Sequence, residues 1–259
     1  MLRIQNSLPG VVVLALAMGI PSPALADPHA TEQWQATYSA RAKYFEKAVG
    51  PLPGDILKML NMTGVWPGGG LFVIPAPRLG KDLAVYTTFG LSNPDMPATA
   101  QSTQFELRGE EHRATRAQTT LQSKQPAPHR EGAAGYGYEL VVVAGDKQEW
   151  PLGLVQWAVN AEIIHDAGLL ERVEKYSGIT VENIDTAGGP LNVLIARAAA
   201  PLPTGLQLPD GHMDVLVATT ITEEEMRWSM KNGRPALLQK LREGGVGQIS
   251  RPGRESVVH

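Results

Sequence analysis

The residue types that most often perform catalysis or bind metals occur in this chain, but their spacing supports neither role. No histidine lies two, three or four residues from another; the six are His29, His112, His129, His165, His212 and His259. There is no HExxH sequence, no GxSxG sequence and no glycine-rich phosphate loop. The absence of cysteine excludes thiol catalysis, cysteine-ligated zinc and iron–sulfur clusters. The sequence therefore predicts no catalytic residue, no metal site and no cofactor.

Two clusters still need an explanation. His212 lies in a predicted turn near Asp210 and Asp214, and a hydrolase can assemble its catalytic groups from distant parts of a chain. A hydrolase therefore stays an alternative, and it requires a deep pocket where His212 meets a carboxylate and a hydroxyl. The acidic residues 223–225 are better explained by the first turn of a helix, where the macrodipole favours negative charge.

Composition excludes further classes of protein. The 259 residues include 23 Lys and Arg and 26 Asp and Glu, which gives a formal net charge of −3. This balance provides no overall basic field for nucleic acid or an anionic membrane. A hydrophobic fraction of 43% is that of a globular chain, so extensive disorder is not expected.

The N-terminus has the parts of a secretory signal peptide in the usual order. Arg3 supplies the positive charge, residues 11–20 form an unbroken apolar run, and Ala24 and Ala26 fit the small-x-small cleavage rule. The run is shorter than the roughly 20 residues that span a membrane. We expect cleavage after Ala26, which leaves a periplasmic or secreted protein without a stable membrane anchor.

The hydrophobic periodicity predicts both helices and strands. A helix is expected over residues 31–49, with Trp34 and Phe45 on its apolar face and Arg41 on another face. Further helices are expected over 150–164 and 222–230 and from 235 to about 243, and strands over 71–74, 83–89, 104–107, 136–143, 179–184, 192–198 and 213–221. The irregular spacing of these strands argues against an alternating barrel. The expected fold class is α/β (mixed α+β), a mixed sheet with flanking helices.

The segment YGYELVVV over residues 136–143 is the strongest predicted strand. Tyr136 and Tyr138 are two residues apart and therefore face the same side, while Glu139 faces the opposite side. Gly137 between the tyrosines would allow another backbone to approach closely. These side chains could contact a partner; alternatively, the tyrosines pack in the core and Glu139 pairs with an internal cation.

Several segments together resemble the suppressor of fused family. Residues 86–93 (YTTFGLSN) resemble its FGLSD strand and turn, residues 131–140 (EGAAGYGYEL) its DGxxGFGFEL segment, and residues 150–156 (WPLGLVQ) its WPxxLLQ helix start. Weaker similarities lie at 105–109, 213–241 and 251–257. We therefore expect a signal peptide over 1–26, a helical and loop segment over 27–82 joined to the domain, and a suppressor-of-fused-like domain over 83–259. The polar stretch 110–133 is expected to be a flexible insert.

This resemblance implies a binding protein and not an enzyme. Animal members of the family clamp a short peptide between two lobes, partly by strand addition, and bacterial relatives are thought to include immunity proteins that neutralise toxins. The residues that the resemblance places in the partner-binding region are Glu131, Tyr136, Tyr138 and Glu139. The expected function is an exported module that sequesters a protein or peptide partner, with a toxin as the leading candidate. A hydrolase and a cell-envelope structural protein are the alternatives.

Overall fold

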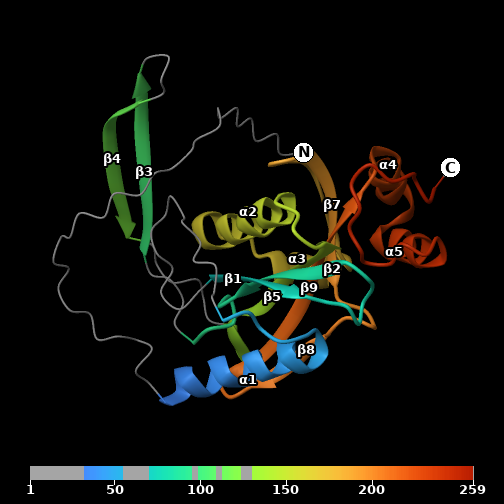
Figure 1. The fold of residues 1–259 in the computed structure, drawn as a ribbon, viewed down its shortest axis with the longest axis horizontal. Coiled ribbons are helices and arrows are strands. Elements are labelled where there is room, and N and C mark those ends of the chain that lie inside the picture. The colour runs from blue at the N-terminus through green and yellow to red at the C-terminus, as the bar shows by residue number, and fades with distance from the viewer. Residues whose placement is uncertain (1–31, 55–69, 95–98, 109–112, 124–129, 259) are drawn as a thin grey trace.

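The computed structural model of the chain describes residues 32–54, 70–94, 99–108, 113–123 and 130–258 (Figure 1). The expected signal peptide, residues 1–26, lies outside the described residues. The helices are α1 (Glu32–Ala48), α2 (Trp150–His165), α3 (Leu169–Tyr176), α4 (Glu223–Asn232) and α5 (Arg234–Glu243). The strands are β1 (Gly70–Pro75), β2 (Leu83–Phe89), β3 (Thr99–Arg108), β4 (Arg113–Ser123), β5 (Ala133–Gly145), β6 (Ile179–Thr186), β7 (Gly189–Arg197), β8 (Gly205–Leu208) and β9 (Gly211–Ile221).

A mixed sheet organises the domain. Its strand order is β1-β2-β5-β9-β7-β6, and β8 pairs with the first residues of β9. The central strands β5 and β9 run parallel, whereas β2 pairs with β5 and β7 pairs with β9 in antiparallel fashion. A parallel pair needs a long crossover, and here the chain forms α2, α3, β6, β7 and β8 before it returns as β9. The predicted mixed α/β fold is therefore confirmed.

Strand β5 is buried on both faces, and its alternating side chains divide the core into two layers. Leu140 and Val142 join the cluster under α2 and α3, whereas Val141 and Val143 join the cluster that contains Phe45 of α1. Figure 1 shows α2 and α1 on opposite sides of the sheet. From Tyr138 to Ala144, a side chain of β5 therefore faces α2 when its number is even and α1 when its number is odd.

Four elements differ from the prediction. Part of the predicted flexible insert, residues 110–133, forms β4, which pairs with a β3 longer than the expected strand at 104–107. Strand β8 lies in a Pro- and Gly-rich stretch that we expected to be a connection, and helix α3 was not predicted. Helix α3 is only eight residues long, and such short periodic segments give a weak signal.

The C-terminal segment is fixed to the end of the sheet. Ile249 forms a parallel bridge to Val143 of β5, and the Ser250 hydroxyl accepts a hydrogen bond from the Thr220 backbone N–H. Further along, Arg254 makes two 2.6 Å bonds to the carboxylate of Glu225, which is fully buried in the first turn of α4. Because Glu225 also closes the predicted capping box with Thr222, one carboxylate joins the start of α4 to the tail.

Because Glu225 must be ionised to make these contacts, the protein should lose stability at acid pH. Burial alone would raise the pKa of Glu225, but the hydrogen bonds from Arg254 and from the Val257 and Thr222 N–H groups, together with the charge of Arg254, lower it overall. The pKa of Glu225 is therefore lower in the folded protein than in the unfolded chain, where a glutamate has a pKa of about 4.3. Such a group stabilises the fold fully above the pKa of the unfolded chain, and this stabilisation disappears as pH falls through the pKa of the folded protein.

We therefore predict that the unfolding free energy of wild type falls more steeply between about pH 6 and pH 3 than that of the Glu225→Gln variant. Urea unfolding across this range measures both slopes. Glu223→Gln, on the same helical turn but exposed, is the control and should keep the wild-type slope. Equal slopes for wild type and Glu225→Gln would show that Glu225 is not the group whose protonation destabilises the protein.

Candidate functional site

Glu139 of β5 is fully buried and lies at the centre of a polar network on the α1 side of the sheet. Its Oε1 accepts hydrogen bonds from the Gly90 N–H (2.8 Å), the Ser92 N–H (3.1 Å) and the Ser92 hydroxyl (2.7 Å). Its Oε2 accepts a 2.5 Å bond from the Thr88 hydroxyl, whose oxygen in turn accepts the Leu140 N–H. The turn after β2 is thus held by the carboxylate that follows Tyr138.

The counter-ion of Glu139 is Arg41, from the middle of α1. Arg41 has no exposed surface; its Nη1 lies 3.2 Å from Glu139 Oε1 and its Nη2 donates a 2.7 Å bond to Asn93 Oδ1. The guanidinium carbon also lies 4.2 Å from the ring centre of Phe89, a cation–π contact. We expected Arg41 on a face of the helix away from the apolar side chains. This expectation is wrong, because Arg41 is buried as the counter-ion of Glu139.

The other side of β5 carries a second polar contact. The Tyr138 hydroxyl, fully buried, donates a 2.8 Å bond to Oε2 of Glu162 in α2. Glu162 also accepts the N–H groups of Gly168 and Leu169, which begin α3. Burial and the nearby Glu162 carboxylate raise the pKa of Tyr138 well above its ordinary value, so its hydroxyl stays protonated and can donate. Tyr138 therefore joins β5, α2 and α3.

Tyr136 is half-buried on the same side, as predicted for residues two apart. Burial, followed by the charges of Glu162 and Asp166, raises the pKa of its hydroxyl, which has no hydrogen-bond partner among the described residues. The close backbone approach occurs at Gly135 and not, as expected, at Gly137. A Cβ at Gly135 would lie 2.5 Å from the carbonyl oxygens of Leu91 and Asn93, whereas one at Gly137 would meet only side chains.

Glu131 is exposed just before β5, beside a row of alternating charges that we call the charged strip. Its charged members are Arg130, Glu174, Arg197 and Asp214, and the His212 imidazole lies at its end. Glu174 lies 2.7 Å from both Arg130 and Arg197, and Arg197 also lies 3.0 Å from Asp214. The His212 Nε2 is 3.4 Å from Asp214. The strip thus joins the segment before β5 to α3, β7 and β9.

The four predicted partner-binding residues are therefore in three different environments. Glu131 is exposed beside the charged strip, Tyr136 is half-buried, and Tyr138 and Glu139 are buried with internal hydrogen-bond partners. For Tyr138 and Glu139 this geometry matches the alternative in which the tyrosine packs in the core and the glutamate pairs with an internal cation. The strip was not predicted, because its residues come from four separate segments and share no local pattern.

The structure gives the hydrolase alternative no support at His212. That side chain is half-exposed, and it does not line either of two pockets on the described surface, the one beside the C-terminal tail or the one beside residues 197–202. No group of three or more His, Asp or Glu residues in the described ranges is arranged to hold a metal ion. Among the helices that the structure describes, none has the length and apolar composition needed to cross a bilayer.

The fold and this site are those of a mixed α/β domain with a charged surface row at the start of its central strands. The family model for Suppressor of fused protein (SUFU) matches residues 55–255, and the chain belongs to this family. The match begins before the domain boundary expected at residue 83 and includes β1, which pairs with β2 in the main sheet.

Two solved structures are similar at 14% sequence identity. One is described as the Sufu-Fu complex crystal structure, with a TM-score of 0.47, 87% of this chain covered and 92% of the other. The second is the crystal structure of Drosophila Suppressor of Fused, with a TM-score of 0.45, 87% of this chain covered and 51% of the other, so this chain spans about half of its length. No curated protein matches.

The buried ion pair predicts strong energetic coupling. Removing one partner of a buried pair leaves the other charge uncompensated and typically costs about 3–5 kcal/mol. We predict such losses for Arg41→Met and for Glu139→Gln, and a double variant that loses clearly less than the sum. Urea unfolding of the four proteins measures the cycle.

The exposed pair Arg227 and Glu223, 3.6 Å apart on α4, is the matched control and should show a coupling of only about 0.3–0.5 kcal/mol. Additive losses at Arg41 and Glu139, within about 0.5 kcal/mol, would show that the two charges do not stabilise each other.

Proposed function

We propose that this chain is a protein-binding module that holds a segment of a partner protein at the charged strip and Glu131. The observation that carries the proposal is membership of the Suppressor of fused family over residues 55–255. The region that the resemblance assigned to partner binding is also where exposed charges of both signs gather.

The geometry of the strip supports binding. Arg197 and His212 are about half exposed, and Arg130 is 42% exposed, so each can reach a partner. Their carboxylate partners fix their positions before any partner arrives, which lowers the entropic cost of binding. Alternating charges of this kind select the register of a partner and exclude partners with the wrong pattern.

We also propose a cellular location and a biological role. The signal-like residues 1–26 support export, and export places the chain where a toxin delivered from a competing cell would arrive. Neutralising a toxin requires only a tight interface, typically about 1,600 Å² in total with a few strong contacts. A periplasmic immunity protein needs no catalytic residue, in agreement with the sequence motifs.

The test of binding expresses the exported chain together with the product of the neighbouring gene as the candidate toxin. Wild type should restore growth and bind the toxin. Glu131→Arg should raise the dissociation constant at least about tenfold while the melting temperature stays unchanged. Glu182→Arg, an exposed charge reversal on β6, is the control and should bind like wild type. Equal protection by the Glu131 variant would exclude Glu131 from the interface, and equal toxin resistance with and without the gene would exclude the immunity role.

Export predicts a processed chain. The protein purified from its native compartment should begin at Asp27, which N-terminal sequencing and intact mass measure directly. A native protein that begins at Met1 would contradict export, and the binding proposal would then need a partner inside the cell.

A further inference from the structure

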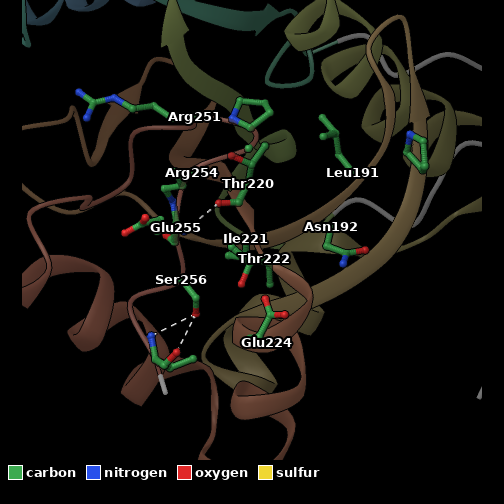
Figure 2. Close-up of a pocket in the computed structure, with 14 residues that line it drawn as sticks. Leu191, Asn192, Thr220, Ile221, Thr222, Glu224, Arg251, Arg254, Glu255 and Ser256 are labelled. Atoms are coloured by element: carbon green, nitrogen blue, oxygen red, sulfur yellow. Dashed lines mark hydrogen bonds between the residues drawn. The ribbon is translucent and has the colours of Figure 1, made fainter.

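A pocket of about 750 Å³ lies at the opposite end of β9 from the charged strip (Figure 2). It is bounded by the start of β7, the end of β9, the first turn of α4 and the C-terminal tail. Six residues of strand separate Thr220 here from Asp214 in the strip, or about 20 Å. The pocket is therefore a separate place on the molecule, and its volume lies in the range of ligand sites.

The tail forms a fixed wall. Arg254 holds Glu225 through its two terminal nitrogens, and the Val257 N–H donates a 2.9 Å bond to the same carboxylate. The Ser256 hydroxyl, bonded to the Val258 carbonyl, closes the last turn of the tail. With these bonds in place the pocket exists before any ligand arrives, as is usual for binding sites.

The interior combines an apolar floor with unused hydrogen-bonding groups. Leu191 and Ile221 supply apolar surface, while the Asn192 side-chain oxygen accepts the Asn183 N–H, which leaves its amide NH₂ to donate elsewhere. Thr220 is only 4% exposed, and its hydroxyl has no partner within the described part of the chain. A buried polar group without a partner costs about 1–3 kcal/mol, so the wall favours a ligand with hydrogen-bonding groups.

The charge that faces the pocket is negative. Figure 2 shows the Glu224 carboxylate turned toward Thr222 and Asn192, whereas the charged ends of Arg251 and Glu255 extend away from Leu191 and Asn192. The positive charge of Arg254 is already matched by Glu225. Bonds from its own backbone N–H and from the Thr222 hydroxyl lower the pKa of Glu224, so this carboxylate is ionised at neutral pH.

We propose that this pocket binds a lysine or arginine side chain carried by an extended peptide segment of a partner. The apolar stem of such a side chain lies along Leu191 and Ile221, and its cationic end pairs with Glu224. The Asn192 amide donates to a peptide carbonyl beside that side chain. The volume exceeds the needs of one side chain, which favours a peptide over a free amino acid. This site does not depend on the charged strip, so either can fail alone.

The test is a titration of the full exported chain with acetyl-Gly-Lys-Gly-amide, followed by amide chemical shifts and calorimetry. Saturable shifts should centre on Leu191, Asn192, Ile221 and Glu224. Glu224→Gln should weaken binding about three- to fivefold, as expected for a solvent-exposed ion pair, and the loss should shrink at high salt. Glu223→Gln is the matched control, because Glu223 is exposed on the same turn and close to the same Arg227 but does not line the pocket.

Three results would overturn the proposal. Equal binding of acetyl-Gly-norleucine-Gly-amide, a control peptide of similar shape that lacks the cation, would exclude recognition of the cation. Equal losses in Glu223→Gln and Glu224→Gln would place the contact on the general surface of α4. Binding of free lysine as tight as that of the peptide, or no saturable binding at millimolar concentrations, would exclude a peptide site. None of these results depends on the toxin assay at Glu131.

Discussion

Burying the Glu139 carboxylate in the middle of the sheet is the constraint on which the site region depends. A buried carboxylate is tolerated only with a counter-charge and with hydrogen bonds to its remaining lone pairs. Here the counter-charge comes from Arg41, 98 residues earlier in the chain, and the hydrogen bonds come from the turn at residues 90–92. One side chain of β5 therefore fixes a helix, a turn and the strand that carries it.

The turn that Glu139 holds also positions the start of β5. The Leu91 carbonyl accepts the Tyr136 N–H at 2.7 Å, and Gly135 lies directly against the Leu91 and Asn93 carbonyls. The adjoining segment, residues 130–132, carries Arg130, Glu131 and the Gly132 carbonyl that accepts the His212 N–H. The exposed charges thus stand on a buried network, and such support keeps a binding surface in one conformation.

Local patterns in the sequence predict the fold more successfully than the site. The alternation in residues 136–143 correctly places Tyr138 and Glu139 on opposite faces of β5, since strand periodicity is a local property. The same kind of evidence misplaces Arg41, because a helical pattern ranks a charged residue as exposed and cannot show a carboxylate far away in the sequence. The charged strip has no local signal at all, since Glu174, Arg197 and Asp214 meet only when α3, β7 and β9 come together. The resemblance identifies the family, but it cannot say which matched residues face inward.

Native-state hydrogen exchange of the Gly90 and Ser92 amides tests the central role of Glu139 most directly. If these amides are held by the buried carboxylate, wild type should protect them nearly as well as Val217 in the core of β9. The Glu139→Gln variant, compared at equal global stability, should lose this protection at residues 90 and 92 while Val217 keeps its own. Protection that is unchanged in the variant, or already absent in wild type, would contradict the account.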